Sequence, residues 1–425
     1  MRAETLGRGG ALCALLLLLM LSAPVLATTA NDLCAAAADP CVVATPVPVT
    51  DNSVIDLGPR ELRINAGGAL DVGSGTMTIK AGRLTVNSGG FVRGTGTTAA
   101  SGGTLNIQAN TILVAGSIDA RGAPGGTINV VSAGDVTIGG STTTPGLTAR
   151  ALALSEVGGT INVTSATLTV TGVVTVFGGS DALGGDISMT TTGSTVITGT
   201  IDATGGDGGS IDIEAGAAPG PGNGDIVISD SAILKVDATG GGGFGGTLDL
   251  LTHGDGVDHG LITVEGLLSA TGVTAGADTG GGLGGCITIT ADGNIVNTRV
   301  AASITAAGGG PDGDGGEVEI TSNHGTVELN GTADAGSAGL ESSGGSVTID
   351  ASADATINGL LTAVAGDGGG GEIDVSSDTA SVQINRTASI DVDSAATGAG
   401  GAICLDSGSG AGSPRAVVVE GTLAA

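Results

Sequence analysis

Short stretches of alternating apolar and polar residues recur along this chain, and most of them follow a pair of glycines. After residue 100 the phrase Gly-Gly, a variable residue and an apolar–polar–apolar triplet occurs ten times, with first glycines 23 to 39 residues apart. The triplets are residues 105–107, 128–130, 161–163, 187–189, 211–213, 248–250, 287–289, 318–320, 347–349 and 373–375, and 403–405 is a degenerate eleventh. Alternation with period two predicts strands with one buried face. Repetition at this spacing predicts a solenoid.

Each repeat contains three such segments. In the repeat that begins at Gly102, the predicted inward pairs are Leu105/Ile107, Ile112/Val114 and Ile118/Ala120. The third pair recurs as an apolar residue, any residue and alanine, for example at Ile201/Ala203 and Val236/Ala238, and glycines follow it. Glycine suits tight turns between strands. The sequence therefore predicts an all-β fold, a single parallel β-helix with three short strands per coil and roughly 13 coils over residues 51–425.

The two ends of the chain differ from the repeats. Residues 1–27 combine early arginines, an apolar run and a small-residue cleavage signal, which predicts a signal peptide. Residues 28–50 contain prolines together with Cys34 and Cys41, and we expect a disulfide-tied cap over the first coil. At the other end, the β-prone run Val417–Val419 predicts either that the natural chain continues past Ala425 or that the last coil self-associates.

Composition and charge narrow the functional classes. Glycine accounts for 83 of 425 residues and there is no Trp or Tyr, so a narrow stacked core of aliphatic residues replaces a globular aromatic core. Disorder is the alternative for a glycine-rich chain, but the strict alternation argues against it. Residues 181–425 carry 32 acidic and 4 basic residues, whereas residues 28–180 are nearly balanced. Such an acidic surface disfavours nucleic acid and anionic membranes and favours cations.

Acidic residues beside glycines are the candidate metal ligands. Asp207, Asp312 and Asp314 lie in glycine-rich loops, as do Asp255 and Asp258, and Ca²⁺ prefers such oxygen ligands. Their spacing is irregular, and turn chemistry alone also places aspartate beside glycine. Calcium is therefore an open alternative, and no other cofactor is predicted.

No catalytic constellation is specified by spacing. His253, His259 and His324 lie in loops, but no acid–base pair accompanies them in the sequence. Cys286 and Cys404 are predicted to face outward on one sheet, four coils apart, too far for a disulfide within one chain. We therefore predict a non-enzymatic protein. A degenerate carbohydrate-active β-helix enzyme is the alternative, although the basic and aromatic residues such enzymes use are scarce. An ice-binding solenoid is a minor alternative, because the outward threonines form no regular ladder.

The Gly-Gly coils of residues 102–405 resemble the right-handed β-helix of filamentous-haemagglutinin-like surface proteins and autotransporter passengers of Gram-negative bacteria. The resemblance implies an exported chain, extracellular or at the cell surface, with a structural or adhesin-like role. The asparagine–proline motifs of the two-partner secretion domain are missing from this sequence. The ligand or surface partner is not identified by any motif, and no transmembrane segment is predicted in the mature chain.

Overall fold

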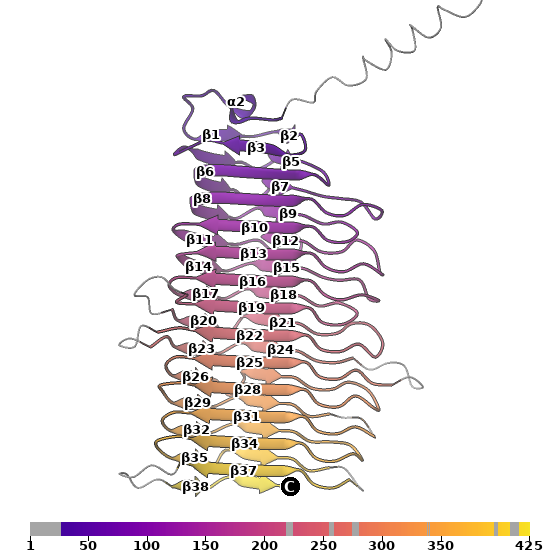
Figure 1. Ribbon diagram of the computed structural model, residues 1–425, viewed down its shortest axis with the longest axis vertical. Helices are drawn as coiled ribbons and strands as arrows, with labels where there is room; N and C mark the ends of the chain where they lie inside the picture. Colours follow the sequence, from indigo (N-terminus) through magenta and orange to yellow (C-terminus); the bar gives the residue numbers. More distant parts are fainter. Residues whose placement is uncertain are drawn as a thin grey trace, which may run out of the picture.

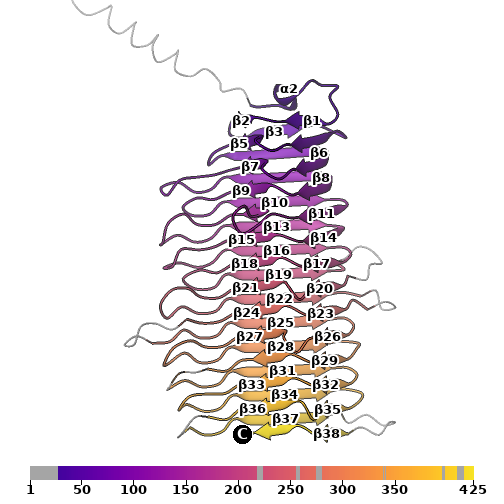
Figure 2. The ribbon, with the colours of Figure 1, turned by 180° about the vertical axis from the view of Figure 1, so that it is seen from behind.

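The chain forms one solenoid of stacked coils. The computed structural model describes residues 27–217, 224–254, 259–273, 280–337, 339, 341–394, 398–408 and 416–425. The coils follow one another in sequence order along the long axis, from the short helix α2 (Ala30–Leu33) at one end to β38 and β39 at the other (Figure 1). Seen from behind, the same order holds and loops project from both sides of the column (Figure 2).

The strands fall into three columns. Two columns share a 25-stranded sheet, and the third forms a 14-stranded sheet. The first column contains β3 (Ser53–Asp56), β10 (Thr127–Ser132), β13 (Thr160–Ser165), β16 (Asp186–Thr191), β19 (Ser210–Ala215), β22 (Thr247–Thr252), β25 (Cys286–Ala291), β28 (Glu317–Ser322), β31 (Ser346–Ala351), β34 (Glu372–Ser377) and β37 (Ala402–Ser407). The second contains β1 (Cys41–Val43), β4 (Glu61–Ile64), β11 (Asp135–Ile138), β14 (Thr167–Val170), β17 (Thr195–Ile197), β20 (Ile226–Ile228), β23 (Ile262–Val264), β26 (Ile295–Asn297), β29 (Val327–Leu329), β32 (Ala355–Ile357), β35 (Val382–Ile384) and β38 (Val417–Val419).

Two long strands, β6 (Thr76–Val86) and β8 (Thr104–Val114), span the first and second columns without a break, because each pairs with strands of both. The third column contains β2 (Pro46–Pro48), β5 (Ala69–Asp71), β7 (Phe91–Arg93), β9 (Ser117–Asp119), β12 (Leu147–Thr148), β15 (Val173–Thr175), β18 (Thr200–Asp202), β21 (Ile233–Lys235), β24 (Leu267–Ser269), β27 (Ser303–Thr305), β30 (Thr332–Asp334), β33 (Leu360–Thr362), β36 (Ser389–Asp391) and β39 (Thr422–Ala424).

Every strand of the three columns pairs in parallel with the equivalent strand of the neighbouring coil. Ile211 in β19, for example, pairs with Ile187 of the preceding coil and Leu248 of the following one, and all three are at most 1% exposed. The predicted parallel β-solenoid is thus confirmed, and the repeated triplets form the first column. The third column has one strand per coil, so the described residues contain 14 coils, against roughly 13 predicted.

The additional coil arises at the start of the chain. Residues 28–50 were expected to form a cap, but β1 already pairs with β4, and β2 pairs with β5. Stacking of the coils therefore begins at Cys41. Only the residues before Cys41 cover this end of the solenoid. The prolines of β2 did not prevent pairing, because this strand lies at the edge of its sheet, where one set of backbone groups has no neighbour.

The covering segment is tied down by covalent and polar contacts. A disulfide joins Cys34 to Cys41, with their Cα atoms 5.6 Å apart. Arg60 of the second coil donates hydrogen bonds to the carbonyl oxygens of Ala35 and Ala38, both at 3.2 Å. Ala30 of α2 is buried against the core. These contacts close the apolar interior at this end.

One inward pair in the third column was assigned two residues too late. The sequence indicated Val236/Ala238, but Leu234 pairs in register with Ile201 and Leu268, so Leu234/Val236 is the equivalent pair. All three apolar residues of this coil are buried, and alternation alone does not choose between the two pairs.

The Gly-Gly corner is shaped by close approach between coils. A Cβ atom on Gly285 would lie 2.1 Å from the carbonyl oxygen of Gly246, the equivalent glycine of the preceding coil. A Cβ atom on Gly246 would likewise lie 2.0 Å from the carbonyl oxygen of Gly209. No side chain fits where two backbones are this close, so glycine at this position is a steric requirement of the stacking.

We predict that Gly285→Ala destabilises the solenoid by about 2–3 kcal/mol, because the added methyl forces the two backbones apart. The matched control is Gly369→Ala, since a Cβ on Gly369 meets nothing within 4 Å. The control should stay within about 0.5 kcal/mol of the wild type. Chemical unfolding followed by circular dichroism measures both. Equal stability of the two variants would contradict the steric argument.

Candidate functional site

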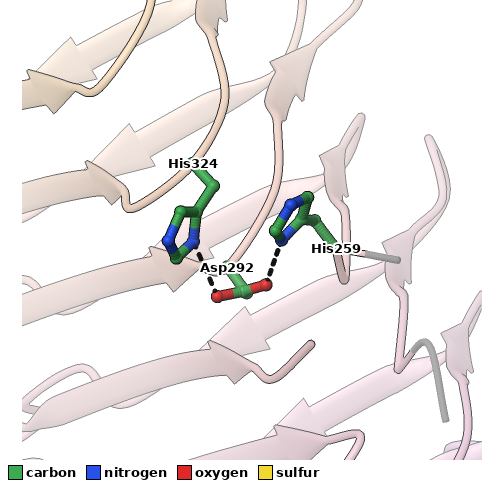
Figure 3. A group of neighbouring side chains, drawn as sticks. All are labelled: His259, Asp292 and His324. Carbon is green, nitrogen blue, oxygen red and sulfur yellow. Dashed lines mark hydrogen bonds and ion pairs between the residues drawn. The ribbon is translucent and has the colours of Figure 1, made fainter. Parts of the chain in front are cut away.

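The structure gathers two histidines and an aspartate at one corner of the solenoid. His259 lies between β22 and β23, Asp292 directly follows β25, and His324 lies between β28 and β29. These are equivalent corners, between the first and second columns, of three successive coils. Figure 3 shows the carboxylate of Asp292 between the two imidazole rings. Residues far apart in the sequence become neighbours here because the coils stack in register.

The three side chains contact one another directly. His259 Nδ1 lies 2.6 Å from Asp292 Oδ2, and His324 Nδ1 lies 3.0 Å from Asp292 Oδ1 (Figure 3). The two rings are stacked, with centroids 4.8 Å apart and planes inclined by 18°. The Asp292 side chain is 17% exposed, whereas His324 is 57% exposed. The site therefore lies at a solvent-exposed corner of the solenoid, and Asp292, the hydrogen-bond acceptor, is its most buried side chain.

Buried hydroxyl groups hold the loops that carry this cluster. Thr252 donates a hydrogen bond to the carbonyl oxygen of Gly260, next to His259, and accepts one from the backbone N–H of Asp292. One coil further on, Ser322 donates to the carbonyl oxygen of Gly293 at 2.7 Å. Each hydroxyl therefore links two adjacent corner loops. These bonds fix the backbone at Gly260, Asp292 and Gly293, next to the cluster.

The electrostatics keep Asp292 ionised. Burial of its carboxyl group acts to raise the pKa, but hydrogen bonds from His259 and His324 and the charge of the imidazoles outweigh burial. The pKa of Asp292 is therefore lower than its ordinary value. A carboxylate in this state accepts hydrogen bonds from both rings.

Two imidazole nitrogens and one carboxylate oxygen could hold a metal ion. One ligand atom from each residue can be chosen so that all lie within 4.8 Å of one another. Imidazole and carboxylate are both common ligands of Zn²⁺ and related transition metals. The same cluster also offers two histidines that are each oriented by a carboxylate oxygen.

The sequence drew attention to the histidines but not to Asp292. Asp292 and His324 both follow the end of a first-column triplet, so alignment of the repeats would place them at the same corner. His259 lies in a longer loop, and its position could not be inferred from spacing. His253, the third histidine, instead pairs with Glu214 of the preceding coil at 2.7 Å.

Two of the aspartates predicted as calcium ligands bridge neighbouring coils. Asp207 accepts a hydrogen bond from the backbone N–H of Phe244 at 2.9 Å, and Asp314 accepts one from Ser343 at 2.7 Å. Asp207 precedes β19 and Asp314 precedes β28, three coils later, so the structure does not bring them together. Asp312 shares the loop of Asp314. Calcium binding here stays a prediction.

Other predicted positions are as follows. Asp255 and Asp258 lie outside the described residues, as does the predicted signal peptide except for its last residue.

Cys286 in β25 and Cys404 in β37 lie four coils apart. Burial raises the pKa of the Cys286 thiol, and the charge of Asp374 raises that of Cys404, so both stay protonated and weakly nucleophilic.

The acidic part of the solenoid stacks like charges. Asp212 in β19 pairs in register with Asp249 in β22. Partial desolvation, followed by the charges of Asp249 and Glu214, raises the pKa of Asp212. Asp186 in β16 differs, because its register partners are Thr160 and Ser210.

Comparisons with known proteins place this chain in no family. No protein-family model matches the sequence, and no curated protein shows significant similarity to it. One solved structure, the crystal structure of the HMW1 secretion domain from Haemophilus influenzae, aligns with this chain at 15% sequence identity. The alignment covers 85% of this chain and 94% of the HMW1 chain. The TM-score is 0.36, and a likeness at that level carries no argument about function. No helix in the described part of the chain is long and apolar enough to cross a bilayer.

We predict that Asp212→Asn stabilises the folded chain at pH 7 by about 0.2–1 kcal/mol, toward the lower end because the side chain is exposed. A pKa raised by folding means that the folded state binds the proton more tightly than the unfolded state. The wild type should therefore gain stability relative to Asp212→Asn as the pH falls from 7 toward the ordinary aspartate value of 3.8.

Added salt should also shrink the difference between wild type and Asp212→Asn, by screening the paired charges. The control is Asp186→Asn, whose register neighbours are uncharged. Thermal unfolding of the three proteins across pH and ionic strength measures both effects. Asp212→Asn and Asp186→Asn responding alike would show that the stacked pair is not the cause.

Proposed function

We propose that this protein is an exported, non-enzymatic β-solenoid with a structural or surface-interaction role of the adhesin-like kind. The observation that carries the proposal is the unbroken stacking of coils along the whole solenoid. Parallel pairing runs without a break from β1 and β2 to β38 and β39, and between the two terminal coils the inward side chains are almost fully buried. Such a column is stiff and elongated, about 60 Å long at about 4.8 Å per coil. This shape suits a spacer or an extended binding surface.

The outer faces support an interaction role. Asn129 donates a side-chain hydrogen bond to Asn106, and Asn162 donates one to Asn129, both at 2.8 Å. This ladder presents equivalent polar groups at the spacing of the coils. A second feature is a shallow groove of about 1000 Å³ that follows the Gly-Gly corners from Gly245 to Gly401. Both features repeat along the axis and so match an extended partner better than a small ligand.

Export is supported by the first 50 residues. The arginines and apolar run of residues 1–27 have the pattern of a cleaved secretion signal. The Cys34–Cys41 disulfide lies at the start of the mature chain, and disulfides persist mainly in oxidising compartments outside the cytoplasm. A location outside the cytoplasm of a Gram-negative bacterium, extracellular or at the cell surface, follows from the same proposal.

Export and surface exposure are tested by expressing the full chain with its own signal in a Gram-negative host. We expect cleavage after Ala27, recovery outside the cytoplasm and, on intact cells, loss of the protein to added protease. A control that lacks residues 1–27 should stay in the cytoplasm. Uncleaved protein retained in the cytoplasm would contradict the proposal. Cleaved protein that protease reaches only after the outer membrane is opened would limit the role to the periplasm.

The enzyme alternative is tested on the purified chain. Polysaccharides incubated with it should release no new reducing or unsaturated ends if the role is structural. Release that is abolished by Asp292→Asn but retained by Asp186→Asn would instead establish the carbohydrate-active alternative and overturn the non-enzymatic proposal.

Self-association is the partner prediction that we retain. Val417, Val419 and Leu423 of the last coil are 40–43% exposed, although the equivalent positions of preceding coils are buried. We expect the purified chain to form dimers or larger assemblies through this coil, and Val417→Lys with Val419→Lys to yield monomers. Val300→Lys is the control, because Val300 is 85% exposed on a loop. The prediction is contradicted if the wild type, the double variant and Val300→Lys all sediment as monomers at high concentration.

A further inference from the structure

We propose that His259, Asp292 and His324 form a binding site for one divalent first-row transition-metal ion, with Zn²⁺ as the biological occupant. The site joins three successive coils, those of β22, β25 and β28. It goes beyond the structural and surface role proposed above, which requires no metal.

The donor set selects the class of ion. Two imidazole nitrogens with one carboxylate oxygen favour Zn²⁺, Co²⁺, Ni²⁺ or Cu²⁺, whereas Ca²⁺ and Mg²⁺ prefer a shell made of oxygens. This separates the site from the aspartate loops at Asp207 and Asp314, which offer only oxygen donors. With three protein ligands, water would complete a tetrahedral shell.

The geometry requires only small side-chain movements. Both Nδ1 atoms already point at the Asp292 carboxylate, at 2.6 and 3.0 Å (Figure 3). Ligand atoms around a tetrahedral Zn²⁺ lie about 3.3 Å apart, given metal–ligand bonds of about 2.0–2.1 Å. The 4.8 Å limit on the present separations is therefore within reach of side-chain rotation at an open corner. The metal would replace the two shared protons that now link the rings to the carboxylate.

Hydrogen bonds fix the described backbone at Gly260, Asp292 and Gly293, next to the ligands. Thr252 and Ser322 are buried, and their hydroxyl groups link the corner loops that carry the three ligands. A metal ion would therefore bind to a corner that the fold has largely prepared, at a lower cost in conformational freedom than on an isolated loop. Because the ion binds the folded state, it should stabilise these coils against unfolding.

The test uses the full mature chain, purified without a histidine tag and treated with a chelator. Titration calorimetry with Zn²⁺ alone should give one site per chain. Co²⁺ alone should give the visible absorption bands of a site with nitrogen and oxygen ligands. Three variants, His259→Gln, Asp292→Asn and His324→Gln, should each weaken Zn²⁺ binding by at least about tenfold.

The matched control is His253→Gln. His253 lies in the same loop as His259 and also contacts a carboxylate, that of Glu214, but it is outside the cluster. It should bind Zn²⁺ as the wild type does, and Zn²⁺ should raise the unfolding temperature of the wild type and of this control alone. Circular dichroism without metal checks that each variant is folded.

Three results would contradict the proposal. One is a wild-type chain that takes up no more Zn²⁺ than His259→Gln does. Another is Zn²⁺ binding that survives in all three ligand variants. Tighter binding of Ca²⁺ than of Zn²⁺ would also contradict the assigned class of ion. Failure of export or of surface exposure would leave the metal-binding result unchanged, so the two proposals are distinguishable.

Discussion

The close backbone contact between successive coils at the Gly-Gly corner constrains the rest of this structure. At Gly285 a methyl group would overlap the carbonyl oxygen of Gly246, and the same relation links Gly246 to Gly209. The following strand begins directly after the corner, so its register on the preceding coil is set there. A shift by one residue would turn every inward side chain of the strand toward solvent. The glycines therefore determine which residues form the core.

From this constraint follows the tolerance of the chain for loops of different length. Repeats of 23 to 39 residues share one register, because the added residues lie between the strands and leave the corners in place. The inward ladder of Ile187, Ile211 and Leu248 continues unchanged past such loops. Outward positions are free to vary, and they carry asparagine ladders in some coils and stacked aspartates in others.

What could be predicted from the sequence follows the same division. The first-column strands were predictable, because a fixed corner precedes a period-two pattern. The pair Leu234/Val236 was missed, since three alternating apolar residues satisfy the pattern in two registers. The start of stacking at Cys41 was missed because β2 is rich in proline. Asp292 was missed for a different reason: its neighbours belong to other coils, and the longer loop before His259 hides the proximity of that histidine.

The His–Asp–His corner shows how a repetitive solenoid can gather side chains from several coils into one local cluster. Equivalent corners stack at the spacing of neighbouring strands, so one residue from each of three coils can reach a common point. His259, Asp292 and His324 do so, whereas Glu214 and His253 form a pair without a third such ligand among the residues that the structure describes. The difference lies in whether a third coil supplies a ligand. In such a fold a substitution at one corner creates or removes a site while the core beneath it stays the same, so that surface chemistry and architecture vary independently.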